Sequence, residues 1–208
     1  MRFADRADAG RVLAGRLTHL RAENPLVLGL PRGGVPVAAE VATRLGAEVD
    51  VVLVRKVGAP GHPELAVGAV GEGDVTVHAD DVLRDLDLAW SDVAATAAGE
   101  RAELRRRAEL LRAGAAPRDL AGRTVILVDD GVATGSTMAA AVRVVRGMGA
   151  ARVVVAVPVA PPDVLVRLGK VADEVVCPLT PQRFVAVGYW YEDFNQVQDS
   201  EVRAILGR

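Results

Sequence analysis

Apolar residues gather along the chain in short continuous runs, with helical patterns between them. A strand with one face in water alternates apolar and polar residues, whereas a parallel strand covered on both faces is apolar throughout. The runs therefore predict buried parallel strands at 25–30, 51–54, 125–128, 153–157 and 175–177. Helical spacing follows the first and third runs, at Val37, Val41 and Leu45 and at Met138, Val142 and Val145. We expect an α/β fold, with an open, mainly parallel, twisted sheet flanked by helices.

Two stretches depart from this alternation. Residues 80–113 are long, helical in pattern and charged, with Leu104, Ala108 and Leu111 on one face, and predict a helical insertion. Residues 178–208 predict a separate C-terminal cap, or hood. Because the chain has neither an internal repeat nor a low-complexity linker, we expect residues 1–208 to form a single domain.

Composition removes several classes of function. The 208 residues carry 25 basic and 27 acidic side chains, and this near-balance argues against a DNA-binding protein. The run Arg105-Arg106-Arg107 could touch nucleic acid, but a solvated helix face paired with Glu103 and Glu109 is the favoured interpretation. A single cysteine, Cys177, excludes a disulfide framework. No apolar run approaches the roughly 20 residues of a membrane span and the N-terminus lacks a signal-peptide core, so we expect a cytoplasmic protein without a membrane partner.

The strongest chemical signal is the run Val125 to Thr137, VILVDDGVATGST. Asp129 and Asp130 follow a buried strand, and a turn of small residues then opens a helix. Glycines let backbone N–H groups approach an anion, hydroxyls add donors, and the helix start adds positive potential. The aspartates can accept hydrogen bonds from vicinal hydroxyls, so the run predicts a sugar-phosphate site. The alternative is a strand that ends in solvated aspartates. A nucleotide triphosphatase is excluded because the loop lacks the G-x-x-x-x-G-K pattern.

Three other positions carry candidate chemistry. Arg32 lies between a proline and two glycines, in a turn where its guanidinium could grip a phosphate; an ordinary turn is the alternative. Lys56 begins a Gly- and Pro-rich stretch, 57–63, that predicts a loop able to close over a site, unless it is a plain surface loop. Five aromatic residues gather in the tail and could stack on a flat heterocycle or simply pack the cap: Phe184, Tyr189, Trp190, Tyr191 and Phe194.

These segments together resemble one family. The run 125–137 resembles the binding signature for 5-phosphoribosyl 1-diphosphate (PRPP) in type I phosphoribosyltransferases. Pro31-Arg32-Gly33-Gly34 is similar to the pyrophosphate loop of that family, and Arg55-Lys56 to the start of its mobile catalytic loop. Residues 184–189 resemble the base-binding hood of the 6-oxopurine members, and the resemblance makes an unusual peptide at Arg32-Gly33 plausible. Residues 80–113 match no part of the family pattern.

The resemblance implies a magnesium-dependent transfer of a phosphoribosyl group from PRPP to a nitrogen of a nucleobase. Asp129 and Asp130 would bind the ribose hydroxyls and stabilise positive charge on the ribose. With Lys56 and Arg32 they form the expected catalytic set. The backbone of Gly33 and Gly34 would help Arg32 to hold pyrophosphate. The 5′-phosphate would lie on Ala133, Thr134, Gly135, Ser136 and Thr137. Mg²⁺ would be bound mainly by PRPP and pyrophosphate oxygens.

The base pocket is expected at Trp190, Tyr191 and Val187, and Glu192 falls where the 6-oxopurine members carry a metal-binding aspartate. Ala133 occupies the position of an aspartate that exchanges a proton with the purine in those members. Hypoxanthine and guanine are therefore the less expected acceptors. Two other functions stay open, a non-catalytic regulator that binds PRPP or a nucleotide and a hydrolase that gives the ribosyl group to water. Members of the family often dimerise, which makes a homodimer compatible with the resemblance.

Overall fold

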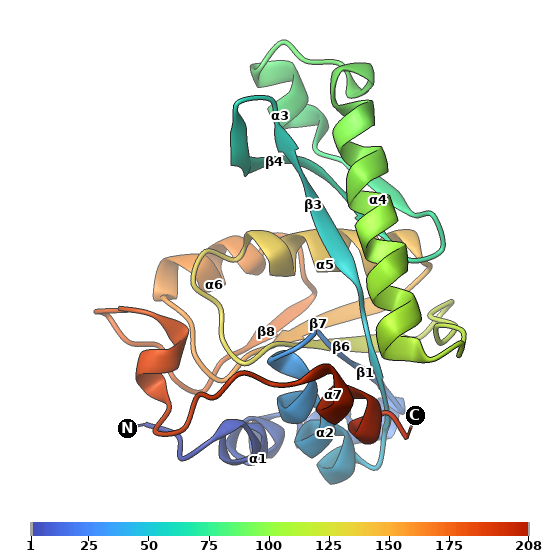
Figure 1. The fold of residues 1–208 in the computed structure, drawn as a ribbon. Coiled ribbons are helices and arrows are strands. Elements are labelled where there is room, and N and C mark those ends of the chain that lie inside the picture. Colours follow the sequence, from blue (N-terminus) through green and yellow to red (C-terminus); the bar gives the residue numbers. More distant parts are fainter. Residues whose placement is uncertain (1, 208) are drawn as a thin grey trace.

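A five-stranded parallel sheet forms the centre of the molecule (Figure 1). The computed structural model describes residues 2–207, apart from the side chains of residues 63 and 64. The strands are β1 (Leu26–Gly29), β2 (Glu48–Val51), β6 (Thr124–Val128), β7 (Arg152–Ala156) and β8 (Glu174–Val176). Their order is β2-β1-β6-β7-β8. The predicted open parallel sheet is confirmed, and its strands β1, β6, β7 and β8 overlap the apolar runs.

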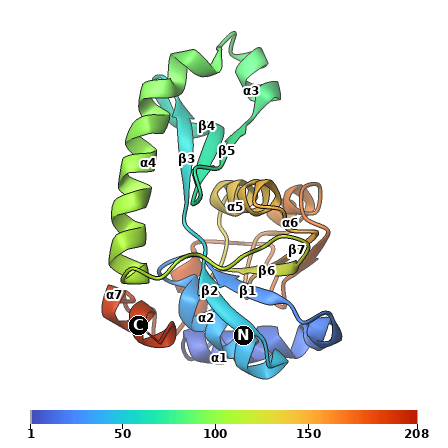
Figure 2. The same cartoon turned by 90° about the vertical axis from the view of Figure 1, so that its right-hand side faces the viewer.

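Helices cover both faces of this sheet (Figure 2). One face carries α1 (Arg6–Arg16), the 3₁₀ helix η1 (Thr18–Glu23) and α2 (Gly34–Leu45), and the other carries α5 (Ser136–Gly147) and α6 (Pro162–Leu168). Successive side chains of a strand point to opposite faces, so Ile126 packs with α1 and α2 while Leu127 packs with α5. Both faces need apolar residues, which explains the continuous runs.

The predicted strand at 51–54 is wrong in its boundaries. β2 ends at Val51 and a new strand, β3 (Val54–Ala59), begins at Val54. Val52 and Leu53 carry the chain out of the central sheet into a second sheet. This sheet is antiparallel, with the order β3-β4-β5, and adds β4 (His62–Gly71) and β5 (Thr76–His78).

The loop predicted after Lys56 is a hairpin, so that prediction is also wrong. Lys56 lies within β3, paired with Ala69 of β4. Gly61 has φ +75° and follows Pro60, the arrangement that a tight turn with proline at its second position favours. The glycines and the proline serve a turn and an irregularity of register around Gly58. Meanwhile the buried side chains of Val57, Ala59 and Val67 hold the hairpin to its neighbours.

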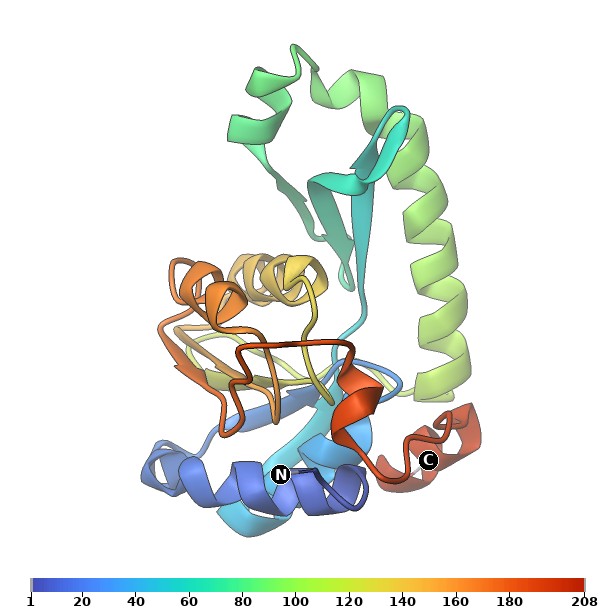
Figure 3. The same ribbon diagram turned by 90° about the vertical axis from the view of Figure 1, so that its left-hand side faces the viewer.

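The small sheet and two helices form an arm beside the central sheet (Figures 1 and 3). The helices are α3 (Asp80–Asp85) and α4 (Trp90–Arg112), so the helical pattern of residues 80–113 is confirmed. Leu104 and Leu111 of α4 are buried and Ala108 is partly buried, on the predicted face. Arg106 pairs with Glu103 on the opposite, solvated face. Among residues 2–207 no helix has the length and apolar character needed to span a membrane.

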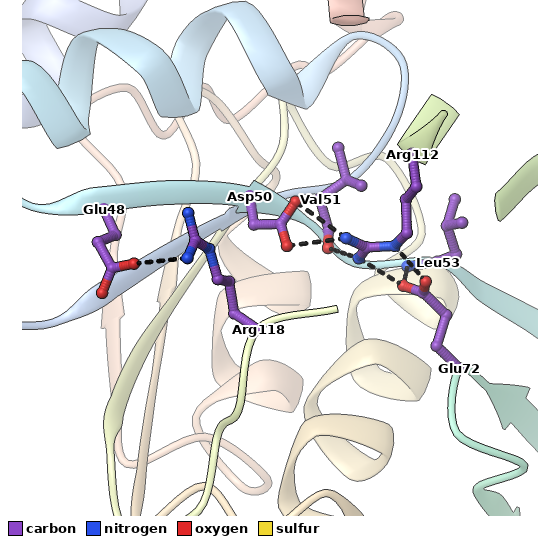
Figure 4. Close-up of polar contacts among 7 residues, drawn as sticks. All are labelled: Glu48, Asp50, Val51, Leu53, Glu72, Arg112 and Arg118. Atoms are coloured by element: carbon purple, nitrogen blue, oxygen red, sulfur yellow. Dashed lines mark hydrogen bonds and ion pairs between the residues drawn. The ribbon is translucent and has the colours of Figure 1, made fainter. Parts of the chain in front are cut away.

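A buried cluster of charges joins the arm to the central sheet (Figure 4). Arg112, at the end of α4, donates hydrogen bonds to Asp50 of β2 and to Glu72, which follows β4. Its guanidinium also donates to the carbonyl of Val51, and Glu72 accepts a hydrogen bond from the backbone of Leu53. The three charged side chains are at most 6% exposed. The cluster therefore fixes the point where the chain leaves the central sheet.

The C-terminal tail packs on both the N-terminus and the arm. It contains the 3₁₀ helix η2 (Val187–Trp190) and α7 (Asp199–Ile205). Phe3 exchanges backbone hydrogen bonds with Trp190 and Glu192. Val202 of α7 is buried in the same apolar cluster as Leu104 and Leu111, beside the end of α4 (Figure 3). The tail is thus held at two places by distant parts of the chain.

Candidate active site

Asp129 and Asp130 lie at the carboxyl edge of the sheet, directly after β6. The parallel register aligns Gly29, Val128 and Ala156, so the loops after β1, β6 and β7 leave the sheet at one edge. The loop after β1 rests on the acidic pair. A Cβ on Gly34 would lie 2.5 Å from the carbonyl oxygen of Val128, and one on Gly33 would lie 2.0 Å from Oδ2 of Asp130. Only glycines permit this approach.

The acidic pair is partly buried and electrostatically strained. Burial raises the pKa of the Asp129 carboxyl well above its ordinary value, and the neighbouring charge of Asp130 raises it further. Burial also raises the pKa of Asp130, although a hydrogen bond from Arg6 opposes that shift. The backbone N–H of Asp130 donates to Oδ1 of Asp129 over 2.9 Å. Such fixed negative charge in a partly desolvated site can stabilise positive charge that develops nearby.

Arg6 belongs to this site although no pattern in the sequence points to it. Its Nε lies 2.8 Å from Oδ2 of Asp130, and both side chains are nearly buried, at 12% and 13% exposure. Its Nη1 donates to the carbonyl of Asn195 over 2.7 Å, and its Cζ lies 4.0 Å from the centre of the Phe194 ring. An arginine 124 positions from its partner in sequence has no spacing that could reveal the contact.

The small-residue turn leads into the start of α5 and is partly exposed. Gly135 has φ +80°, and a glycine there lets the chain turn into the helix. Ala133, Thr134 and Thr137 are exposed. The first N–H groups of a helix have no partner within it, so those of α5 are suited to an anion. Nζ of Lys56 donates to Oγ of Ser136 over 3.3 Å, which brings β3 of the arm to this turn.

Arg32 lies in the loop after β1, and the peptide between Pro31 and Arg32 is cis. The unusual peptide therefore precedes Arg32, one bond earlier than the resemblance suggested. Nη1 of Arg32 lies 3.6 Å from Oδ1 of Asp199, the first residue of α7. The Arg32 side chain is 27% exposed.

A cleft of about 590 Å³ lies between the arm and the segments that follow β1 and β6. Pro31 and Thr137 line it from the central domain, and Arg55 and Lys56 line it from β3. Helix α4 adds Thr96, Glu100, Leu104 and Arg107, which sequence reasoning did not connect with the site. Arg55 donates a hydrogen bond to Glu100, which joins β3 to α4 along the arm side of the cleft. The spacing of Thr96, Glu100 and Arg107 predicts that they share one face of the helix. The sequence does not show that this face lies beside the β3-β4 hairpin.

The prediction that Tyr191 lines a base pocket is wrong. Its ring is 1% exposed, packed on Phe3 and Phe194, and its hydroxyl donates to the backbone carbonyl of Asp130. Burial raises the pKa of this phenol, so the hydroxyl stays a donor. Tyr191 therefore holds the backbone at Asp130 in place, a role that a buried aromatic ring with a polar hydroxyl can fill.

The other tail residues have different surroundings. Val187 covers the turn after the acidic pair, since a Cβ on Gly131 would lie 2.5 Å from its Cγ1. Trp190 is partly buried, and its indole N–H has no acceptor among the residues that the structure describes. The Glu192 side chain is exposed. In the described part of the chain, no three His, Cys, Asp or Glu side chains form a metal-binding group.

Comparison with known proteins agrees with this geometry. A family model described as the phosphoribosyl transferase domain matches residues 5–193. Rv0571c of Mycobacterium tuberculosis, provisionally named a phosphoribosyl transferase, is 53% identical over 209 residues. The match covers 99% of this chain and 46% of that protein, so the chain spans about half the length of this relative.

Solved structures give the same fold. The crystal structure of TT1426 from Thermus thermophilus matches with a TM-score of 0.93 and 55% identity, over 99% of this chain and 98% of that one. The AQ2163 protein of Aquifex aeolicus matches with a TM-score of 0.52 and 14% identity, over 88% and 78% of the two chains, and supports the fold alone. The family model spans the central sheet, the arm, the loop 31–34 and the turn 131–137. The chain therefore belongs to the phosphoribosyl transferase domain family.

Proposed function

We propose that this chain transfers the 5-phosphoribosyl group of PRPP to a nitrogen of a nucleobase-like acceptor and releases pyrophosphate. The observation that carries the proposal is the direct packing of the Gly33-Gly34 loop on Asp130, next to the small-residue turn at the start of α5. Two anion-binding loops on either side of an acidic pair fit a ribose that carries phosphate at one end and diphosphate at the other.

In this reaction the C1–O bond to the diphosphate breaks and a C1–N bond forms. The diphosphate leaves with the electron pair, and the acceptor nitrogen gives up its proton. Asp129 and Asp130 hold the ribose hydroxyls and stabilise the positive charge that builds on the ring. Arg32 grips the diphosphate, which requires its guanidinium to share or leave its contact with Asp199. Lys56 donates to the phosphates from β3.

Magnesium is proposed as the cofactor. Mg²⁺ prefers oxygen ligands and usually keeps only one or two contacts with protein beside substrate phosphates. The chemistry of the described residues fits such an ion, because the acidic pair and the exposed Glu192 offer carboxylate oxygens as ligands. Phosphate oxygens of PRPP would hold the ion and Glu192 is a candidate protein ligand. When bound, the ion would neutralise charge on the leaving diphosphate.

The acceptor is proposed to be a heterocycle other than hypoxanthine or guanine. The exposed methyl group of Ala133 offers no carboxylate to exchange a proton with a purine ring. Trp190 remains the candidate stacking residue. Its indole N–H is buried and lacks an acceptor within residues 2–207.

Pyrophosphate release from PRPP and Mg²⁺ with a panel of purines and pyrimidines tests the proposal. Release that depends on the base supports a transferase. Release without a base indicates a hydrolase, and binding without release indicates a regulator. Changing Asp129 and Asp130 together to Asn should keep the fold but lower turnover by about 10²-fold or more, with donor binding weakened less. Unchanged turnover in this variant would contradict the roles given to the pair.

A further inference from the structure

Arg6 makes more contacts in the site than an arginine in a typical surface ion pair. Three groups fix its guanidinium: the carboxylate of Asp130, the carbonyl of Asn195 and the face of Phe194. The Nε and Nη1 contacts are 2.8 and 2.7 Å long, which is typical of strong charge-assisted bonds. With 12% of its side chain exposed, Arg6 has little freedom to move.

These contacts join three distant segments at one carboxylate. Arg6 begins α1, Asp130 follows β6, and Asn195 and Phe194 belong to the tail. Tyr191 of the same tail donates to the backbone carbonyl of Asp130. The carboxylate of Asp130 is therefore oriented by α1, while its backbone is held by the tail. A carboxylate has about four acceptor positions, so the bond to Arg6 leaves capacity for a ligand hydroxyl.

We propose that Arg6 is a positioning residue for Asp130, holding its carboxylate ionised and correctly oriented to accept a ribose hydroxyl of the donor. This inference rests on the proposed function. A carboxylate that is partly buried beside a second carboxylate would otherwise take up a proton or rotate away. Arg6 supplies the compensating charge from outside the substrate-binding loops. Its contribution should appear in the chemical step more than in donor binding, because orientation matters most where charge develops.

The experiment compares Arg6→Ala and Arg6→Lys with the wild type, and uses Arg11→Ala as the control. Arg11 lies on the same helix but its side chain is 58% exposed, with partners at 3.5 and 3.9 Å. With PRPP, Mg²⁺ and the best acceptor of the panel, Arg6→Ala should lower kcat about tenfold or more and change the KM for PRPP less. Arg6→Lys should recover part of kcat, and Arg11→Ala should match the wild type.

A second readout does not depend on activity. Carboxyl resonances of the ligand-free protein report the titration of Asp130, which is faced by Arg6 from α1, by Asp129 from its own loop and by the Tyr191 hydroxyl from the tail. In Arg6→Ala the pKa of Asp130 should rise further, because a cation at hydrogen-bond distance is lost. Arg6→Lys should restore it in part.

The outcomes separate the two proposals. If the wild type neither binds PRPP nor releases pyrophosphate, the proposed function is overturned and the role of Arg6 falls with it. If the wild type is active while Arg6→Ala shows wild-type kcat and an unchanged titration of Asp130, only the role of Arg6 is overturned. A loss of kcat with an unchanged titration of Asp130 would also overturn it, because Arg6 would then act by another route.

Discussion

The aspartate at position 129 occupies a place where a charge is costly. Burial and the adjacent Asp130 both raise its pKa, and the contact that eases the strain, from Arg6, reaches Asp130 rather than Asp129. The sequence predicted both aspartates as functional, because their position after an apolar strand and before a small-residue turn is a strong local pattern. It could not predict Arg6 or the burial of Tyr191, because those contacts depend on how the two ends of the chain meet.

Replacing Asp129 by Asn should therefore raise the free energy of unfolding and lower turnover. A carboxyl whose pKa is raised in the folded state binds protons more readily than in the unfolded chain, so stability falls as pH rises through the raised range. Asn removes the charge and can still accept the N–H of Asp130. At pH 8 the free energy of unfolding should increase by about 1–2 kcal/mol, with a smaller gain at pH 5. Urea unfolding at the two pH values measures this, with exposed Asp163→Asn as the control. Equal or lower stability at pH 8 would contradict the account.

Among the elements, sequence reasoning misjudged the boundaries of β2 and the hairpin of β3 and β4. Glycine and proline between 57 and 63 indicate interrupted structure, but the same residues form a tight turn when apolar positions on both sides can pair. Four of the central strands were predictable because each contains a continuous apolar run, whereas β2 carries Glu48 and Asp50. Strand β3, VRKVGA, mixes charged residues with apolar ones, and the cluster of Asp50, Glu72 and Arg112 puts charges at buried positions. A hydrophobic pattern therefore does not reveal the strands and the helix end of the arm.

The same cluster predicts a large stability effect from one substitution. Arg112→Met should lower the free energy of unfolding by about 3–5 kcal/mol, because it removes the guanidinium that compensates the charge of two buried carboxylates. Combining it with Asp50→Asn and Glu72→Gln should recover much of the loss, since the uncompensated charges are gone. Denaturant unfolding of the single and triple variants measures both. Arg118→Met, which removes an exposed pair with Glu48, should cost no more than about 1 kcal/mol. A single variant as mild as Arg118→Met would show that the cluster does not hold the arm.

At the scale of the whole molecule, the site belongs to two bodies. The central domain holds the acidic pair, the loop 31–34 and the turn 131–137. The arm holds Arg55, Lys56 and the part of α4 that lines the cleft (Figure 1). The sequence predicted that the acidic pair and the small-residue turn lie together, because one continuous run of thirteen residues contains both. The part of the site on the arm is spread over β3 and α4, which lie far apart in the sequence, and their convergence follows from the fold of the arm and not from any local pattern.

A ligand that fills the cleft should therefore tie the arm to the central domain. Amide hydrogen exchange across residues 57–72 should slow several-fold when PRPP and Mg²⁺ are added, because contacts from Lys56 to the phosphates reduce opening of the hairpin. Exchange in β7, which is already buried in the central sheet, should change little and is the internal control. Lys56→Ala should weaken this ligand-dependent protection. Equal exchange of the hairpin with and without saturating PRPP would mean that the arm takes no part in holding the donor.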